Sequence, residues 1–163
     1  CSLRAAHEQV ELNRVGKAVS ILSPGSEFPQ FETLQPHDHL CLSFNDVAVH
    51  SPGLATPQSH DLQKLLMFIK SWDKKLPILI HCWAGVSRST AAAYIATCLL
   101  QPKRDEVDLA LELRSASPSA TPNPMLIALA DEALGREGRM RSAIEGIGRG
   151  ANAFEGGPFR LLL

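Results

Sequence analysis

A cysteine and an arginine stand six positions apart in one short segment, His81-Cys82-Trp83-Ala84-Gly85-Val86-Ser87-Arg88-Ser89-Thr90. The apolar run Pro77-Ile78-Leu79-Ile80 precedes this segment directly, and an alanine-rich stretch follows it. In open α/β folds, a buried parallel strand delivers a loop to the carboxyl edge of the sheet, where ligands bind. The pattern therefore predicts a strand, a ligand-binding loop and a helix over residues 77–100.

The residue types in this loop are suited to holding an anion. Successive N–H groups of residues 83–88 and the start of the next helix would point at one anion, and Gly85 permits the tight curl. Arg88 offers a planar fork that takes two phosphate oxygens at once. The same positive potential would favour the thiolate form of Cys82, which is the nucleophilic form of a cysteine.

The segment resembles the signature of the cysteine-dependent protein tyrosine phosphatases, which is His-Cys, five residues, Arg, and then Ser or Thr. The matching residues are His81, Cys82, Gly85, Arg88 and Ser89. The string Ala84-Gly85-Val86-Ser87-Arg88-Ser89 is most similar to the dual-specificity branch, and the C-terminal tail resembles a prokaryotic-type subgroup of the family. The resemblance implies a three-layer α/β/α fold with a central, mainly parallel sheet.

The resemblance also implies a role for each loop residue. Cys82 would attack phosphorus to give a phosphocysteine, and the Ser89 hydroxyl would hydrogen-bond the thiolate as it leaves. His81 would orient the loop and would be neither acid nor base. The phosphate would be bound by the loop residues Trp83, Ala84, Gly85, Val86, Ser87 and Arg88. No cofactor and no metal are expected.

Such a mechanism needs a proton donor for the leaving oxygen, which is worth about 10² to 10⁴ in rate. Asp46 follows the strand-like run 40–44 and so would reach the carboxyl edge of the sheet, where the family places its acid. Asp61 and Asp73 stand at the ends of the next helix and are explained as a cap or a solvated charge. Asp38 precedes the strand. We predict Asp46 as the general acid, the alternative being a turn aspartate bonded to its own backbone.

Hydrophobic periodicity and turn residues predict the other elements. Strands are expected over 18–22 and 40–44, and helices over 3–12, from Pro57 to about 74, over 88–100 and 105–114, and from Pro122-Asn123-Pro124 to about 138. The helix from Pro57 is predicted to bury core residues at helical spacing, namely Leu62, Leu65, Leu66, Phe68, Ile69 and Trp72, and neither Met67 nor Trp72 needs a cofactor to explain it. Trp83 is predicted to pack under the loop, with a place on the pocket rim as the alternative.

Composition limits the function classes. With 163 residues, 45% of them hydrophobic, the chain can bury a core of its own. We predict one dual-specificity-phosphatase-like domain over residues 1–163, in which 139–163 is a glycine-rich extension packed on the body or, alternatively, a partner-binding tail.

The net charge of −1 argues against a nucleic-acid partner. No window of 18 apolar residues and no leader segment are present, so no membrane association is expected.

The cysteines and histidines do not show the spacing of a metal site. The four cysteines are scattered, at Cys1, Cys41, Cys82 and Cys98, and free thiols indicate a reducing compartment, here the cytoplasm. Cys41 or Cys98 could form a disulfide with an oxidised Cys82, but small buried hydrophobes explain both more simply. The pair His37 and His39 around Asp38 is interpreted as a polar turn.

Two function classes follow. The first is an active phosphomonoesterase of the dual-specificity type, acting on phosphotyrosine and on phosphoserine or phosphothreonine. The second is a module that binds phosphoprotein without turnover. The presence of Cys82, Arg88 and Ser89 together favours the enzyme. Its substrate would be a phosphorylated protein or a small phosphomonoester, and because Trp83 and Val86 are uncharged, where relatives acting on polyphosphorylated lipids often carry lysine, a mono-phosphorylated ligand is preferred.

Overall fold

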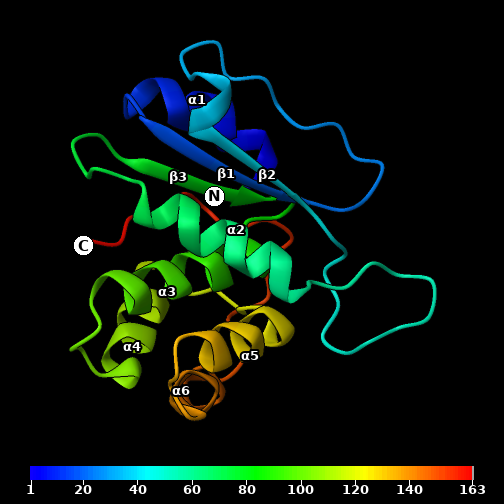
Figure 1. The fold of residues 1–163 in the computed structure, drawn as a ribbon, viewed down its shortest axis with the longest axis vertical. Coiled ribbons are helices and arrows are strands. Elements are labelled where there is room, and N and C mark those ends of the chain that lie inside the picture. The colour runs from blue at the N-terminus through cyan, green and yellow to red at the C-terminus, as the bar shows by residue number, and fades with distance from the viewer. Residues whose placement is uncertain (163) are drawn as a thin grey trace.

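A computed structural model describes residues 1–162 of the chain (Figure 1). The elements follow one another as α1 (Leu3–Leu12), β1 (Lys17–Leu22), the short 3-10 helix η1 (Pro36–Asp38), β2 (His39–Ser43), α2 (Ser59–Lys70), β3 (Ile78–Cys82), α3 (Arg88–Leu100), α4 (Glu106–Ala116), α5 (Pro124–Ala133) and α6 (Arg139–Ile147). The strand, loop and helix predicted over residues 77–100 are confirmed by β3 and α3.

The three strands form a parallel sheet in the order β2-β1-β3. β1 is the central strand, in which Val19 lies opposite Leu40 of β2 and Ile80 of β3. Because all three strands run in the same direction, the segments that follow them meet at one edge of the sheet. The chain after Ser43 and the chain after Cys82 therefore emerge at the same edge, on either side of the end of β1.

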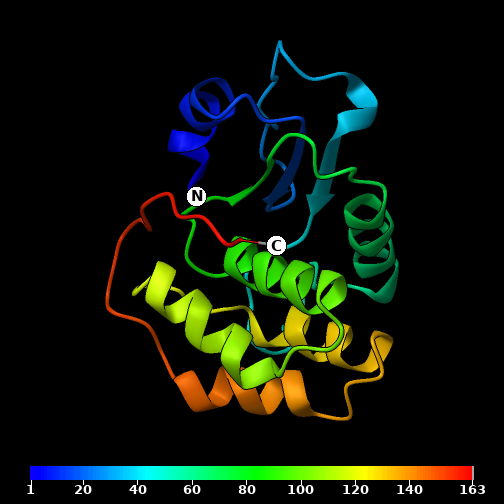
Figure 2. The same ribbon diagram turned by 90° about the vertical axis from the view of Figure 1, so that its left-hand side faces the viewer.

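Helices cover both faces of this sheet (Figures 1 and 2). α1 lies on one face and closes a small apolar core that includes Ala6, Val10, Val15, Ala18 and Phe31. α2 and α3 lie on the other face, and α4, α5 and α6 extend that layer outwards. The larger core on that side includes Val19, Ile21, Leu42, Phe44, Leu65, Ile69, Tyr94 and Ile95. The predicted three-layer α/β/α fold is confirmed.

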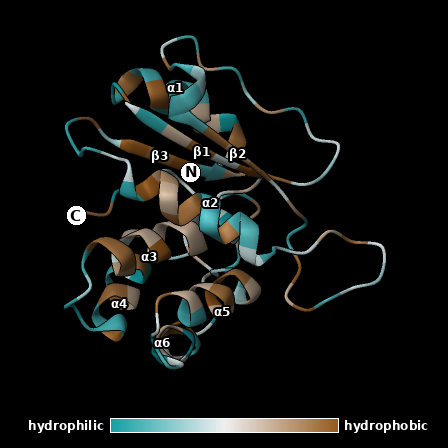
Figure 3. Cartoon of the chain, in the orientation of Figure 1, coloured by the Kyte–Doolittle hydropathy of each residue, from teal (hydrophilic) through white to brown (hydrophobic). Residues whose placement is uncertain are grey.

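α2 begins at Ser59, two residues later than the predicted start at Pro57. Its first turn is closed by a capping box, in which the Gln58 N–H donates to Asp61 Oδ2 at 3.0 Å. Asp61 is therefore a helix cap, as predicted, and it lies on α2 and not in the loop at the sheet edge. Figure 3 shows both hydrophilic and hydrophobic residues along α2, and its buried apolar residues are Leu62, Leu65, Leu66 and Ile69, at the spacing of one helix face.

One residue of this region is less buried than predicted. Trp72 is only half-buried. It lies beyond the last helical residue, Lys70, and its Nε1 donates to the carbonyl of Leu76 at 2.7 Å. The expectation that Trp72 is a core residue is therefore wrong. Met67, which follows two buried leucines, falls on the solvent face of α2 and is 71% exposed.

The helix predicted from Pro122-Asn123-Pro124 to about 138 ends earlier, with α5 at Ala133, and a further helix, α6, begins after it at Arg139. The break contains Gly135, Glu137 and Gly138, all with positive φ, which ends one helix and redirects the chain. The buried carboxylate of Asp131, on α5, accepts from the N–H groups of Gly138 at 2.6 Å and Met140 at 2.8 Å. Asp131 thus satisfies the free N–H groups at the start of α6, which the sequence analysis did not predict.

Residues 148–162 leave α6 without helix or strand and return along the body to the end of β3, as the orange and red segment of Figure 2 shows. The Gly156 N–H donates to the carbonyl of Ala84, in the loop after β3, at 2.8 Å. Phe159 and Leu161 pack against the larger core. Within residues 1–162, no helix is both long and apolar enough to cross a bilayer.

Candidate active site

The loop between β3 and α3 lies at the carboxyl edge of the sheet and curls tightly. Gly85 has φ of +72° and packs so closely on the first residues of the chain that a Cβ there would lie 2.6 Å from the Cys1 carbonyl carbon. Only glycine fits this position, both for its backbone angle and for its space. The sequence prediction that Gly85 permits the curl is confirmed.

Most carbonyl groups of the loop have hydrogen-bond partners in the protein, whereas its N–H groups have none within the described part of the chain. The carbonyls of Trp83, Ala84, Val86 and Ser87 accept from N–H groups of Leu3, Gly156, Thr121 and Ala91, respectively, at 2.8 to 3.1 Å. In contrast, none of the five N–H groups of residues 83–87 donates to a residue in the range 1–162. Since the carbonyls are held by the surrounding protein and the N–H groups are not, these N–H groups are available to bind an anion.

Cys82 is the last residue of β3 and is only 1% exposed. Its Sγ lies 3.1 Å from the Oγ of Ser89, which is also buried, in the first turn of α3. A thiolate at Cys82 would accept this hydrogen bond from the Ser89 hydroxyl. The start of α3 adds the positive end of a helix dipole to the same space. The sulfur and the hydroxyl are thus close together, as the sequence analysis expected.

Arg88 is held by one end of its guanidinium. Nη1 donates to the carbonyl of Phe44 at 2.8 Å and to Ser23 Oγ at 3.2 Å, and the side chain is buried. Nε, on the other edge of the fork, is also buried but has no hydrogen-bond partner among residues 1–162. A buried cation with an unused donor is costly, so this edge is arranged for an anion that accepts from it.

Asp46 lies just after β2, beside the loop. Its Oδ1 accepts from Ser87 Oγ at 2.7 Å and from Asn123 Nδ2 at 2.8 Å, and its Oδ2 lies 3.8 Å from Arg88 Nε. About a third of the side chain is exposed, so it is accessible from solvent. The neighbouring Asn45 accepts through its Oδ1 from the Ala55 N–H at 2.9 Å, and this contact joins the two ends of the segment that contains Asp46.

His81 supports the loop from inside the protein. It is fully buried, and its Nε2 lies 2.6 Å from Ser20 Oγ, which is itself 2.7 Å from His39 Nε2. Burial lowers the pKa of His81 to about 4, and it also lowers the pKa of His39. Both rings are therefore neutral near pH 7. His81 contacts Ser20 and the carbonyl of Cys82, and not the open side of the loop.

The Trp83 side chain is 62% exposed, so the prediction that it packs under the loop is wrong. Its carbonyl accepts from the Leu3 N–H at 3.1 Å, which fixes the backbone against α1 and leaves the ring outside. The ring therefore lies on the surface of the protein, and a place on the pocket rim stays a prediction.

Several residues of the site were not identified from the sequence. Asn123 was assigned only to the start of a helix, yet it also contacts Asp46. Ser23 and Ser20, which bind Arg88 and His81, are polar residues at or near the end of β1, and a polar residue in a buried strand was the one available signal. The contacts of the C-terminal segment with the loop have no local signal.

No group of three or more histidine, cysteine, aspartate or glutamate side chains is arranged to hold a metal ion in the described part of the chain. His37 and Asp38 form an ion pair at 3.5 Å when the imidazole is protonated, and Asp38 also pairs with Lys17 at 3.1 Å. The four cysteines are all free thiols. Cys41 is exposed on β2, and Cys98 is buried in α3, where burial raises the pKa of its thiol to about 11.

Comparison with known proteins agrees with this geometry. The sequence model of the protein-tyrosine phosphatase family matches residues 51–121. No curated protein matches the chain in sequence. Among solved structures, the chain is similar to Cydia pomonella PTP-2 phosphatase, with a TM-score of 0.61 and 23% identity, over 79% of this chain and 78% of that one.

Two dual-specificity phosphatases have the same fold. DUSP15 has a TM-score of 0.62 and 19% identity, over 89% of this chain and 88% of its own. Human DUSP28 has a TM-score of 0.62 and 19% identity, over 83% and 86%. The family match includes the whole loop from Cys82 to Arg88, and the structural matches extend over most of the fold. Residues 51–121 are therefore similar in sequence to the protein-tyrosine phosphatase family, and the chain has a dual-specificity-phosphatase-like fold.

Proposed function

We propose that the protein is a phosphomonoester hydrolase that acts through a phosphocysteine intermediate on phosphotyrosine, and on phosphoserine or phosphothreonine, in proteins. One observation carries the proposal. The N–H groups of residues 83–87 and Nε of Arg88 have no acceptor among residues 1–162, and they belong to the loop directly after Cys82 and to the first residue of α3. A phosphate dianion would accept from both sets of donors while its phosphorus faces the sulfur.

In the first step, Cys82 Sγ would form a bond to phosphorus while the bond from phosphorus to the ester oxygen breaks. The loop N–H groups and Arg88 would bind the three remaining phosphate oxygens, whose charge is spread in the transition state. The protonated carboxyl of Asp46 would give its proton to the leaving oxygen, so that an alcohol or phenol departs and not an anion. Asp46 is suited to this because Ser87 and Asn123 fix it beside the loop.

In the second step, a water molecule would attack the phosphocysteine and form inorganic phosphate. Asp46, now ionised, would accept a proton from that water, and the bond between phosphorus and Cys82 Sγ would break. The departing thiolate would accept a hydrogen bond from Ser89 Oγ, at 3.1 Å in the structure. Nucleophile, cation and acid would all come from the chain, so the proposed mechanism requires no metal. A thiolate nucleophile works only while it is reduced, which favours a reducing compartment such as the cytoplasm.

The test is hydrolysis of an aryl phosphate and of a phosphotyrosine peptide by the purified chain, with and without a chelator. Cys82→Ser should abolish turnover, whereas Cys41→Ser, at an exposed free cysteine, should keep it. Acid quench of the wild type with a radiolabelled substrate should trap labelled protein, and Cys82→Ser should trap none. Binding of phosphopeptide without any turnover by the wild type would contradict the enzyme and support a recognition module.

The roles of Arg88 and Asp46 can be tested in the same assays. Arg88→Lys keeps the charge but loses the fork, so turnover should fall by about 10²-fold or more even though Lys is also a cation. Asp46→Asn should cost about 10² to 10⁴ in turnover on a substrate with a poor leaving group, and much less on one whose leaving group departs readily. An equal loss on both kinds of substrate would contradict the role of Asp46 as proton donor.

A further inference from the structure

A cavity of about 320 Å³ lies beside the phosphate-binding loop. The loop contributes Val86 and Ser87 to its lining, and the C-terminal segment contributes Arg149 and residues 151–153. This volume is at the lower end of the range of about 300 to 1,000 Å³ that is typical of ligand pockets. Since Ser87 directly precedes the arginine of the loop, a group bound in the cavity would be a close neighbour of a phosphate bound by that loop.

The part of the C-terminal segment that lines the cavity is held firmly. The Gly150 N–H donates to Thr121 Oγ1 at 3.1 Å, and the next N–H, of Ala151, donates to the carbonyl of Pro118 at 2.9 Å. Gly150 also packs directly on backbone, because a Cβ there would lie 2.5 Å from the carbonyl carbon of Ser119. The backbone next to Arg149 is therefore held in place, so the arginine side chain extends from a fixed point.

The cavity is lined by two charged residues, and only one of them has hydrogen-bond partners in the part of the chain that the structure describes. Asp46 lines it but already accepts from Ser87 and Asn123, and it lies 3.8 Å from Arg88. Arg149 is the one cation among the described residues of the lining, and its exposed side chain makes no hydrogen bond or ion pair within residues 1–162. The charge available to a ligand in this cavity is thus positive.

We propose that this cavity binds an anionic side chain close in sequence to the phosphorylated residue of a protein substrate, and that Arg149 is a specificity-determining residue. The inference rests on the proposed phosphatase function and narrows its substrate class. A peptide is favoured because a short stretch of chain can place one anion in the loop and a second in the adjacent cavity. The lining also contains the polar residues Thr121, Asn123 and Asn152 and five small apolar residues that suit the methylene groups of such a side chain, namely Ala48, Val86, Pro124, Ala151 and Ala153.

The experiment compares kcat/KM for phosphotyrosine peptides that differ at one position near the phosphotyrosine. At each position on either side, the variable residue is glutamate, phosphoserine, glutamine or lysine. The wild type is compared with Arg149→Glu and with the matched control Arg141→Glu, which reverses the charge of an exposed arginine on α6. An aryl phosphate is assayed in parallel to establish that each preparation is active.

At one or more positions, the wild type should prefer glutamate or phosphoserine to glutamine by about fivefold, the upper range for an ion pair at an exposed site. This preference should shrink at high salt. Arg149→Glu should reverse it in favour of lysine, which a merely structural role of the residue would not do, and Arg141→Glu should keep it. A larger effect of phosphoserine than of glutamate would identify a second phosphate as the preferred anion, and the converse would identify a carboxylate.

The two proposals fail in different ways. If the wild type hydrolyses the aryl phosphate and the peptides but shows no preference at any position, or if Arg149→Glu keeps the preference, the inference about Arg149 is overturned and the phosphatase function stands. If the wild type hydrolyses none of the substrates, the phosphatase function is overturned, and the inference falls with it.

Discussion

Asn123 Nδ2 donates to Asp46 Oδ1 at 2.8 Å, although the two residues are 77 positions apart in the sequence. The other end of the same amide accepts from the Leu126 N–H at 3.0 Å, which caps α5. Nδ2 also donates to the carbonyl of Val47 at 3.0 Å. One side chain therefore joins the start of a helix to the segment that carries the proposed acid, so that the position of Asp46 depends on the position of α5.

The variant Asn123→Asp separates these two functions of the amide. Aspartate can still cap α5, so stability should change little, but it cannot donate to Asp46 and it adds a like charge beside it. Turnover on a substrate with a poor leaving group should fall by about tenfold to 10²-fold, with a smaller effect on KM. Asn123→Ala should lose the cap as well, at a cost of about 1 kcal/mol in the free energy of unfolding. Unchanged turnover in Asn123→Asp would contradict a positioning role.

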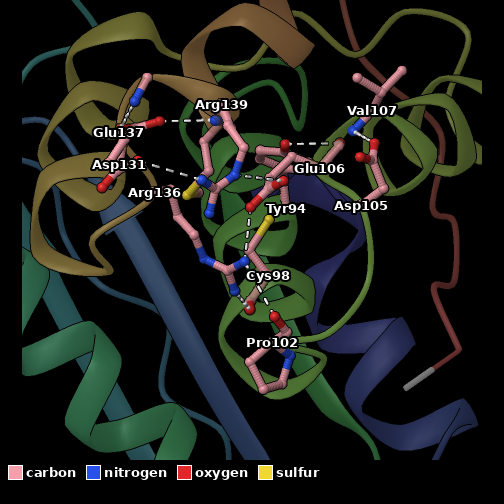
Figure 4. A network of polar contacts seen from close by, with 12 residues as sticks. Tyr94, Cys98, Pro102, Asp105, Glu106, Val107, Asp131, Arg136, Glu137 and Arg139 are labelled. Carbon is pink, nitrogen blue, oxygen red and sulfur yellow. Dashed lines mark hydrogen bonds and ion pairs between the residues drawn. The ribbon is translucent and has the colours of Figure 1, made fainter.

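A buried ion pair stabilises the helical layer far from the site (Figure 4). Glu106 Oε1 accepts from Arg136 Nη1 at 2.7 Å, both residues being buried, and Oε2 accepts from Arg139 Nε at 3.2 Å. Arg136 Nη2 donates to the carbonyl of Cys98 at 2.7 Å. These contacts tie α3 and α4 to the turn between α5 and α6, as the dashed lines in Figure 4 show.

Glu106→Gln should destabilise the protein by about 3 to 5 kcal/mol, because it leaves the buried guanidinium of Arg136 without its counter-charge. The free energy of unfolding in urea measures this. The double variant Glu106→Met with Arg136→Met should be more stable than Glu106→Gln, since it removes both buried charges. The matched control is Glu112→Gln, in an exposed pair with Arg104, and it should change stability little. Equal stability of Glu106→Gln and wild type would contradict this account.

The close approach of Gly156 to the phosphate-binding loop gives a third prediction. A Cβ at Gly156 would lie 2.7 Å from the carbonyl oxygen of Gly85, so Gly156→Ala must push either the C-terminal segment or the loop aside. We expect a loss of about 1 to 3 kcal/mol in unfolding free energy and a weaker affinity for the phosphate mimic vanadate. Gly157→Ala is the control, because a Cβ there has no atom within 4 Å. If both variants bind vanadate equally well, the segment does not support the loop.

The residues of the site that could be predicted from the sequence lie mainly in one short segment, residues 82–89. Cys82, Arg88 and Ser89 are brought together by a strand, a turn and a helix that follow one another, so local spacing is enough to place them. Asp46 could be placed because parallel strands end at one edge, which brings the chain after β2 next to the loop. The catalytic roles of these residues stay predictions until activity is measured.

The parts that could not be predicted depend on contacts between distant segments. The contact of Asn123 with Asp46, the crossing of residues 148–162 over the loop and the contribution of Arg149 all require the packed fold. α6 was missed because its start is capped by Asp131 of the preceding helix and not by a residue at its own first turn. Trp83 was misplaced because hydrophobicity alone does not indicate on which side of a curled loop a side chain lies.

The last prediction concerns pH. His81 is buried with its Nε2 2.6 Å from Ser20 Oγ, and the nearby rings of His39 and His7 also disfavour a positive charge on it. Burial lowers its pKa from 6.5 to about 4 in the folded protein. Between these two values the unfolded chain binds more protons than the folded one, so the free energy of unfolding decreases as pH falls from about 6.5 to 4. The lowered pKa of His39 acts in the same direction.

For His81 alone the loss approaches about 1.4 kcal/mol for each pH unit in this window, and above pH 6.5 the histidine adds no pH dependence. Urea unfolding of the wild type, His81→Gln and His39→Gln at pH 7, 6 and 5 measures the slope. Both variants should show a shallower decrease than the wild type, with the larger change for His81→Gln, and His39→Gln provides the comparison if His81→Gln folds poorly. The exposed His50 is the control, because His50→Gln should keep the wild-type slope. Slopes that are identical in all four proteins would show that the buried histidines do not limit stability at low pH.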